Sequence, residues 1–467
     1  MDSADDRLDT LTYHGVWQGV AASGLYSPFW FSATSDGTVP IAPLSTSLRG
    51  GIEKEAVRHA RWWDYSYGID ILGIGALESY WRTLDIISLK PALTPRIVKL
   101  YAHARLWCFD LTVGWKPVDW GNQDYGLTSG GMLLSHNAPT MPRVTIGIDR
   151  YTPIPFTYGY LEVKGNITHG WFTDGNGVKG ALLHYKHIGI RIGGNLPVNI
   201  NYEFHHAAQW GGVSDVYGRL GSSLSNWWNI FRAKAGGVMG NDQINAEGNH
   251  LGAQMLGVDV KWDGWKIKAY WQNIFEDGPI RFIFSTMNIS DGLWGLSIRQ
   301  SKWPYISGVL YEFLGTTDQS GPVHDIDGII FGGGDGYFSN SIYTQGWNHY
   351  RMTMGTPFVT SPAYNTDGSL RSYNDRTFTH HIAIQGDIYG FKYLARYSHS
   401  TNFGTYSRPV VPVAVNAALL HVEKQVPRAW NLNFGASIGI DTEDGTLRSF
   451  GVMLTVAKRG IAWFSKR

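Results

Sequence analysis

Alternation between apolar and polar side chains is the feature of this sequence that most restricts its fold. Over residues 257–262, apolar side chains alternate with the charged side chains of Asp259 and Lys261. The Asp263-Gly264 dipeptide that follows is typical of a two-residue hairpin turn, and the alternation resumes directly after it. The last hairpin of the chain repeats the pattern. A period of two residues indicates half-buried strands, so we expect an all-β protein.

The lengths of the connections indicate which all-β architecture the chain adopts. We count about 18 strands within residues 9–458. Connections after even-numbered strands are tight, as at Asp263-Gly264, whereas those after odd-numbered strands are usually long. The longest connections are 116–142, 209–248 and 317–375. An even strand number with the long loops at one end is typical of an outer-membrane barrel, and a soluble sandwich has no reason for this asymmetry.

The sequence therefore predicts a transmembrane antiparallel β-barrel, one domain covering residues 1–467, with short periplasmic turns and long extracellular loops. Among the expected strands are 62–75, 94–104, 391–402 and 415–425. The composition agrees, because the chain has 57 Gly and 14% aromatic residues but only 16% charged residues. Soluble domains average about 25% charge, and a lipid-facing half of every strand explains the difference.

Composition also excludes several other classes of protein. A formal net charge of +1 gives no electrostatic reason for binding nucleic acid. The single cysteine, Cys108, excludes an intrachain disulfide and a multi-thiolate metal site. No run of about 18 apolar residues occurs, so no transmembrane helix is expected. Residues 1–7 lack the pattern of a signal peptide. For a protein of the bacterial outer membrane, we expect that a signal peptide has been removed from this chain.

The loop 116–142 places an aromatic ring, an amide and a carboxylate close together, at Trp120, Asn122 and Asp124. Sugars bind to such groups, because a pyranose ring stacks on an aromatic face while its hydroxyls need planar donors and acceptors. The alternative is that Trp120 packs the loop and that the two polar side chains cap turns. On composition alone, this alternative has the better support.

A second polar stretch lies where the expected strand 197–208 reaches its outer end. Alternation places Glu203 and His205 toward the lumen, next to the outer rim, with Gln209 and Trp210 just beyond them. These groups could bind a polar ligand or fasten the following loop, and both interpretations have equal support. The loop returns through an amide-rich stretch beside the neighbouring strand, so both stretches should meet at one rim. The candidates of this returning stretch are Asp242, Asn245 and Asn249. Further rim candidates, whose alternative is hydrogen bonding within their own loops, are Asn273 and Trp347.

No arrangement of residues predicts catalysis. The chain has 16 His residues, but pairs such as His184 and His187 lie an odd number of positions apart on a strand and point to opposite faces. Motifs of serine hydrolases, zinc proteases and phosphate-binding loops do not occur in the sequence. A lipase-type site on a barrel stays open as a minor alternative. We therefore expect no catalytic residues, no metal and no cofactor.

Several short segments together resemble one known family. They are Trp120-Gly121-Asn122, the run Leu-Leu-Ser-His-Asn-Ala at 133–138, Gln209-Trp210-Gly211-Gly212, Asn249-His250-Leu251-Gly252 and Trp271-Gln272-Asn273. With these segments the chain resembles the capsule-assembly Wzi family of outer-membrane proteins, in the form found in Bacteroidetes. The resemblance implies a barrel of about 18 strands that its loops close to free flow. It also implies a lectin, not an enzyme, that holds capsular polysaccharide at the cell surface.

Three hypotheses for the function follow. The first is a monomeric barrel in outer-membrane lipid that anchors surface polysaccharide at the rim of its outer loops. The second is a substrate-selective porin whose lumen is lined by Asn201, Glu203, Lys266 and Lys268. The third is a subunit of a larger surface complex, which docks partner proteins on the loop 317–375.

Overall fold

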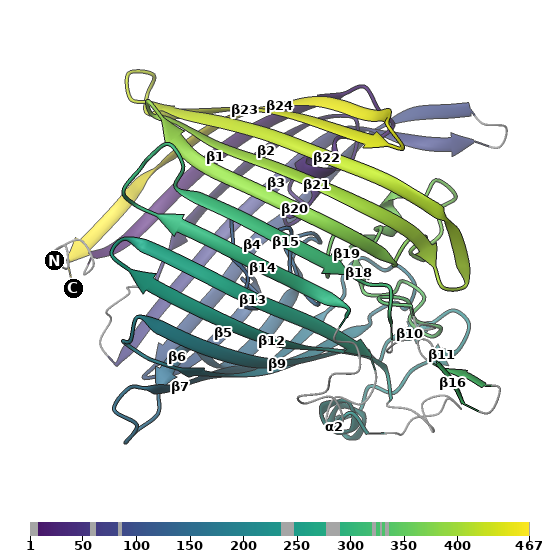
Figure 1. Ribbon diagram of the computed structural model, residues 1–467, viewed down its shortest axis with the longest axis horizontal. Coiled ribbons are helices and arrows are strands. Elements are labelled where there is room, and N and C mark those ends of the chain that lie inside the picture. Colours follow the sequence, from purple (N-terminus) through teal and green to yellow (C-terminus); the bar gives the residue numbers. More distant parts are fainter. Residues whose placement is uncertain are drawn as a thin grey trace.

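The computed structural model describes residues 8–56, 62–82, 86–234, 247–276, 290–319, 324–326, 329–331 and 336–466. Within these residues, 18 strands form one closed sheet (Figure 1). The barrel strands are β1 (Leu8–Ala22), β2 (Leu44–Lys54), β3 (Trp63–Arg82), β4 (Ile86–Leu106), β5 (Phe109–Trp115), β6 (Pro142–Pro153), β7 (Leu161–Trp171), β8 (Leu182–Ile192), β9 (Val198–Trp210), β12 (Asn249–Trp262), β13 (Trp265–Glu276), β14 (Gly292–Gln300), β15 (Gly308–Gly315), β20 (Thr377–Ile388), β21 (Phe391–Thr405), β22 (Arg408–Val426), β23 (Leu432–Glu443) and β24 (Thr446–Lys466). Each strand is antiparallel to the next, and pairing of β1 with β24 closes the barrel. The predicted antiparallel barrel of about 18 strands is confirmed.

The two ends of the barrel differ. Leu8 pairs with Lys466 at one end, where Figure 1 marks both termini and where the tight turns lie, and we call this the short-turn end. The other is the long-loop end. The smaller elements belong to its connections: α1 (Phe29–Ser32), β10 (Val213–Ser214), β11 (Gly218–Arg219), α2 (Leu224–Arg232), β16 (His324–Ile326), β17 (Ile329–Phe331), β18 (Asn348–His349), β19 (Met352–Thr353) and the 3-10 helix η3 (Pro362–Tyr364). No helix in the described part of the chain is long and apolar enough to cross a membrane.

The Asp263-Gly264 turn shows how local sequence sets the register of a hairpin. Asp263 has φ 42° and Gly264 has φ 80°. Positive φ at both central residues is what a type I′ turn requires, and this turn matches the twist of paired strands. Trp262 therefore pairs directly with Trp265, and every later pair of β12 and β13 follows from that one.

The hairpin of β3 and β4 is longer than the sequence predicts. The predicted strands ended at residue 75 and began at residue 94, but pairing continues to Arg82 and Ile86. Two prolines, Pro91 and Pro95, interrupt the alternation there. They are tolerated because this part of β4 pairs with β3 alone: β5 joins β4 only from Leu100 onward, so a missing N–H leaves no second ladder incomplete. The β21–β22 hairpin likewise extends through residues that were predicted as a loop.

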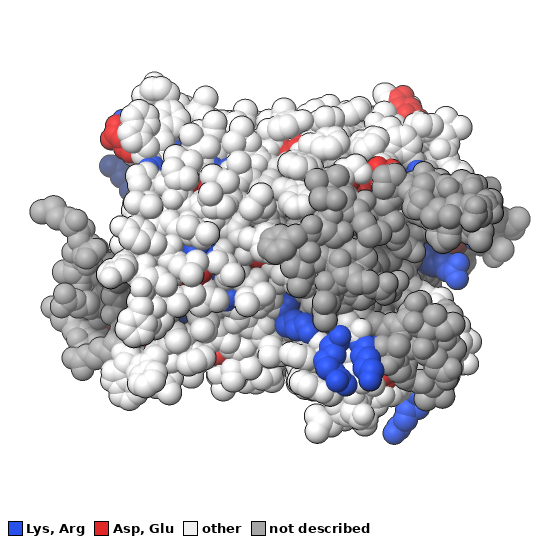
Figure 2. Space-filling model, turned by 60° about the horizontal axis from the view of Figure 1, so that its bottom comes forward, with Lys and Arg blue, Asp and Glu red and all other residues white. Residues whose placement is uncertain are grey.

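The outward face of the barrel is apolar. In β23, Phe434, Ile438 and Ile440 are exposed, whereas Ser437 between them is buried on the lumen side. Figure 2 shows the wall that faces the viewer largely free of Lys, Arg, Asp and Glu side chains. An apolar outer face combined with a polar lumen face is the arrangement of a transmembrane barrel.

Three long connections at the long-loop end fold back into the lumen. They are residues 23–43, 116–141 and, from the connection after β15, 316–319 and 336–376, and we call them together the plug. Their most completely buried side chains include Leu127, Met132, Leu133 and Trp347. These side chains belong to one buried apolar cluster that also contains residues from the lumen side of the wall. The plug therefore supplies the apolar core that a wide, polar lumen lacks.

The plug is fastened to the wall by buried hydrogen bonds. The carboxylate of Glu312 in β15 accepts from Thr128 Oγ1 at 2.6 Å and from the backbone N–H of Ser129 at 2.8 Å. Gln272 in β13 accepts from the backbone N–H of Met132 at 2.9 Å. On the two strands that follow β15 in the sheet, His381 in β20 and Arg396 in β21 donate to backbone carbonyls of the same loop.

The segments of the plug also hold one another. The indole N–H of Trp347 donates to the carbonyl of Leu133 at 2.7 Å, and Ser135 Oγ donates to the carbonyl of Gly355 at 2.6 Å. Fixed contacts of this kind between separate loops give the long-loop end a single, ordered shape.

Candidate functional site

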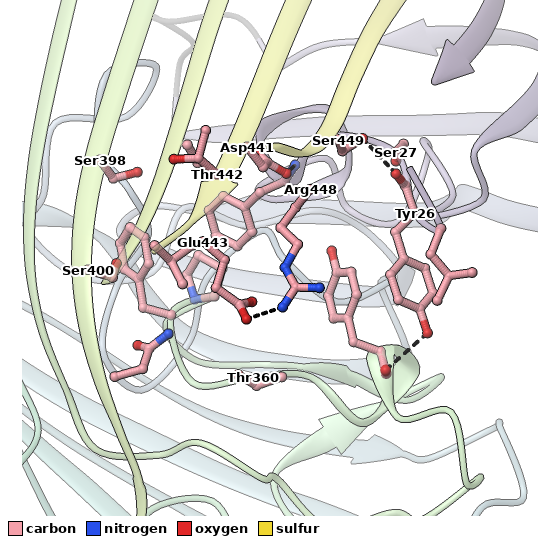
Figure 3. Close-up of a pocket in the computed structure, with 18 of the residues that line it drawn as sticks. Tyr26, Ser27, Thr360, Ser398, Ser400, Asp441, Thr442, Glu443, Arg448 and Ser449 are labelled. Carbon is pink, nitrogen blue, oxygen red and sulfur yellow. Dashed lines mark hydrogen bonds and ion pairs between the residues drawn. The ribbon is translucent and has the colours of Figure 1, made fainter. Parts of the chain in front are cut away.

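A cavity of about 600 Å³ opens at the long-loop end, between the plug and the inner faces of β21–β24. One wall comes from two plug segments, residues 25–29 and 357–364. The other wall comes from lumen-facing side chains of β21–β24. Side chains at every second position of a strand point the same way, so one strand can contribute several of them. Figure 3 shows both walls with side chains that point into the space between them.

The plug wall of this mouth cavity is aromatic. Phe29 stacks on Phe358 with ring centroids 5.5 Å apart, and Tyr26 meets Tyr364 edge to face at 5.1 Å. The Tyr26 hydroxyl donates to the backbone carbonyl of Tyr364 at 3.0 Å. The rings are therefore fixed in place before any ligand arrives.

The strand wall of the mouth cavity is polar. Ser398, Ser400 and Asn402 follow one another on the lumen face of β21. Asp441 in β23 uses Oδ2 to accept from the backbone N–H of Phe29 at 2.7 Å, while its buried Oδ1 has no hydrogen-bond partner among the described residues. At the edge of the cavity, Arg448 and Glu443 form an ion pair (Figure 3).

A second cavity of about 450 Å³ adjoins the first, and Tyr26 lines both. Its lining includes Arg96 of β4 and, from the plug, Tyr350 and Arg351. The Arg96 guanidinium lies over the Tyr350 ring at 5.2 Å. Two cavities that meet at one tyrosine form an extended hollow across the mouth of the barrel.

The plug loops beside these cavities are joined by a charged contact. His136 lies between Asp36, 2.9 Å from its Nδ1, and Asp119, 3.0 Å from its Nε2. Burial alone would lower the pKa of His136, but the hydrogen bonds and charges of the two carboxylates raise that pKa to about 10. His136 is therefore a cation at neutral pH, and it ties residues 23–43 to residues 116–141.

The structure places the first group of sequence-predicted residues inside the lumen. Trp120 packs edge to face on Tyr185 at 4.5 Å. Asn122 donates to the carbonyl of Leu256 at 2.9 Å, and Asp124 forms an ion pair with Arg299 at 2.7 Å. Burial would raise the pKa of Asp124, but hydrogen bonds from Arg299 and Ser297 lower it below its ordinary value. Trp120 therefore packs, as the alternative expected, whereas Asn122 and Asp124 bond to strands of the wall and do not cap turns.

Glu203 and His205 face the lumen, but they do not lie next to the outer rim as predicted. β9 starts at the short-turn end with Val198, so Glu203 lies in the half of the lumen below the plug. There it accepts from Tyr151 Oη at 3.0 Å and pairs with Lys164 at 2.8 Å.

The remaining rim candidates that the structure describes are buried, and Gln209 and Asn249 among them join the wall to the plug. Gln209 and Asn249 are cross-strand partners, which confirms that the two stretches meet, and Gln209 also donates to the carbonyl of Gly346 at 2.9 Å. Asn273 donates to the carbonyl of Asp291 at 3.0 Å. The fractional exposures are 0% for Gln209, 3% for Trp210, 5% for Asn249, 3% for Asn273 and 0% for Trp347. Asp242 and Asn245 lie outside the described residues.

The residues that line the mouth cavity were missed by the sequence reasoning. None of the described rim candidates is among them. The polar run Ser398, Ser400 and Asn402 at the outer end of a predicted strand was an available signal, since alternation places all three toward the lumen. No group of three or more possible metal ligands occurs among the described residues.

Comparisons with known proteins give one informative similarity. No family model and no curated protein matches the sequence. The chain is similar to the solved structure of Wzi from Escherichia coli, with a TM-score of 0.59, 13% identity, and coverage of 95% of this chain and 84% of that chain. Two more distant structures are OccK5 from Pseudomonas aeruginosa (TM-score 0.47, 8% identity, 97% and 98% coverage) and OccAB4 from Acinetobacter baumannii (0.46, 8%, 98% and 99%). Wzi is described as an outer-membrane protein involved in group 1 capsule assembly and as a carbohydrate-binding β-barrel, and this chain shares its barrel fold.

Proposed function

We propose that this chain is a bacterial outer-membrane barrel that binds surface polysaccharide in the mouth cavity. The observation that carries the proposal is the pairing of a fixed aromatic wall, with Tyr26 and Phe29, and a wall of hydroxyl, amide and carboxylate groups. Sugars need both, because their C–H faces pack on rings while their hydroxyls need hydrogen-bond partners. The carbohydrate binding described for Wzi, which has the same fold, supports the proposal.

The two cavities together suit a polymer that runs from the first cavity into the second. A saccharide unit in the first cavity would pack on the plug wall and donate a hydroxyl to Asp441 Oδ1, the acceptor that lacks a partner among the described residues. The next unit would pass Tyr26 into the second cavity. A surface that continues past one ring suits a polymer, and we propose that one barrel chain holds it as a lectin without catalysis.

The porin alternative has weaker support. Asn201, Glu203, Lys266 and Lys268 do line one cavity, as that hypothesis required. The plug fills the lumen above them, however, and Asn122 of the plug lines the same cavity from the other side. The docking alternative is weakened similarly, because Trp347 and Val359 of the loop 317–375 are buried in the plug.

Binding of purified polysaccharide to the full chain in detergent tests the proposal. We expect Tyr26→Ala and Asn402→Ala each to weaken binding severalfold, by on the order of 1 kcal/mol, because they remove a ring face and an amide. Tyr217→Ala is the matched control, since Tyr217 is an exposed aromatic residue in a connection at the same end but lines neither mouth cavity. Unchanged binding by both cavity variants would contradict the proposal.

A further inference from the structure

A separate cavity of about 250 Å³ lies on the short-turn side of the plug. Its lining residues come from six strands and the plug: Gly121, Asn122, Tyr151, Lys164, Arg191, Asn199, Asn201, Glu203, Asp259, Lys261, Lys266 and Lys268. Asn122 is held over it by a hydrogen bond to the carbonyl of Leu256 and by another from Lys268 to its own carbonyl at 3.0 Å. The cavity is therefore closed above by the plug and does not share residues with the mouth cavities.

Most charges of this lower cavity are paired. Lys164 lies 2.8 Å from Glu203, Lys268 lies 3.6 Å from Asp259, and Arg191 pairs with Glu162 at 2.5 Å. Each of these cations therefore has its own carboxylate.

Lys261 and Lys266 differ from the other cations. In the described part of the structure, neither has an ion pair or a side-chain hydrogen bond, and they are direct cross-strand partners on β12 and β13. On its other side, Lys266 is paired in register with Arg299 of β14. Like charges directly opposite one another destabilise a sheet, so this arrangement favours an anion that lies between them.

The cavity also presents two unused acceptors. The side chains of Asn199 and Asn201 are 3% and 4% exposed, and neither Oδ1 atom has a hydrogen-bond partner in the described residues. Their amide N–H groups are engaged, with the carbonyl of Leu196 at 2.9 Å and with Asp259 at 3.4 Å. Leaving a buried hydrogen-bond acceptor without a donor costs folding free energy. A hydroxyl group of a ligand could supply the missing donor to each of these two oxygens.

We propose that this lower cavity binds a small sugar that carries an anionic group, a carboxylate or a phosphate. The anion lies between Lys261 and Lys266, and hydroxyl groups of the sugar donate to Asn199 and Asn201. The volume is just below the range of roughly 300–1,000 Å³ usual for drug-sized ligands, so the cavity takes one sugar unit and not a chain. The site is independent of polysaccharide binding at the mouth, because the plug separates the two.

Calorimetric titration of the full chain in detergent tests this site, with glucuronate, glucose 6-phosphate, glucose and inorganic phosphate as probes. We expect one or both anionic sugars to bind, and glucose to bind about tenfold more weakly or worse, since a hydrogen bond to a charged group is lost. Glucuronate and glucose 6-phosphate distinguish a carboxylate ligand from a phosphate ligand. Inorganic phosphate should bind more weakly than the preferred sugar, because it lacks the hydroxyls that the two amides accept from.

Variants locate the binding. Lys261→Gln and Lys266→Gln, singly and together, should each weaken binding of the anionic sugar, and both remove like-charge repulsion, so the barrel should still fold. Lys302→Gln is the control, since Lys302 lies at the same end but pairs with Asp263 at 2.5 Å. Equal binding by the wild type and the double variant, or no binding of either anionic sugar, would overturn the site. Inorganic phosphate that binds as tightly as the preferred sugar would overturn its preference for sugars.

Discussion

Single residues with the chemistry of a sugar site can equally hold the plug in place, and composition cannot distinguish these two roles. Trp120 and Asn122 have the chemistry of a sugar site, yet the ring packs on Tyr185 and the amide fastens the plug. Asp441 divides its two oxygens between these purposes, because one holds the backbone of Phe29 and the other faces the mouth cavity without a partner among the described residues.

His136 makes the order of the plug depend on pH. The ordinary pKa of His is 6.5, and the two carboxylates raise that of His136 to about 10 in the folded protein. Because the folded value is the higher one, its stabilisation is complete below pH 6.5 and is lost as the pH rises through about 10.

Limited proteolysis of the plug at several pH values, compared between the wild type and His136→Gln, measures this contribution. The wild type should be the more resistant at pH 7, and the difference should shrink above pH 10, where His136 has lost its proton. A difference that stays constant over this range would show that the charge of His136 does not hold the loops.

At the scale of elements, strands and loops differ in what the sequence reveals. Alternation identified all 18 barrel strands, because a strand exposes its period locally and a turn such as Asp263-Gly264 sets its register. The ends of strands were less predictable: Pro91 interrupts the pattern where the β3–β4 hairpin still continues. The path of a loop into the lumen has no period at all, so the buried positions of Leu127 and Trp347 could not be foreseen.

The loop 116–141 is the element on which closure of the lumen depends. It contacts β12 through Asn122, β15 through Thr128 and β20 through Leu127 on one side of the barrel. On the other side Thr140 donates to the carbonyl of Val98 in β4, so the loop bridges the lumen. We expect the wild type to carry no steady ion current in planar bilayers, and a variant in which residues 121–138 are replaced by a short glycine-serine linker to conduct. Shortening the connection at β10–β11 is the control, because those strands pair with each other outside the barrel sheet. A conducting wild type would favour the porin hypothesis.

At the scale of the whole molecule, closure is a property of the sheet. The pairing of β1 with β24 closes the sheet, so only hairpin extensions such as the outer part of β3–β4 pair on one side alone. Unboiled protein should therefore migrate differently from boiled protein in an SDS gel, because a closed barrel resists the detergent until it is heated. Identical migration would contradict a closed barrel. The same gel shows whether each variant described above is folded.

The two walls of the mouth cavity could not be matched from the sequence, because they become neighbours only when the sheet closes. Ser449 Oγ donates to the carbonyl of Tyr26 at 2.8 Å across 423 positions of the chain. The alternation predicts that Tyr26 follows one strand and that Ser449 lies near the start of another. Those two strands are neighbours only because the sheet is closed. The lower cavity was partly foreseen, because Asn201 and Glu203 of β9 and Lys266 and Lys268 of β13 face the lumen by the period of their strands, which flank β12.

Closure through the first and last strands also sets an order of events during assembly. Part of one wall of the mouth cavity comes from the connection after β1, and part of the other comes from the β23–β24 hairpin, the last hairpin of the barrel in chain order. A chain that lacks β24 can form most of the sheet, yet it has no Arg448 or Ser449 to face Tyr26 across the cavity. The mouth cavity is thus complete only when the first and last strands of the barrel pair.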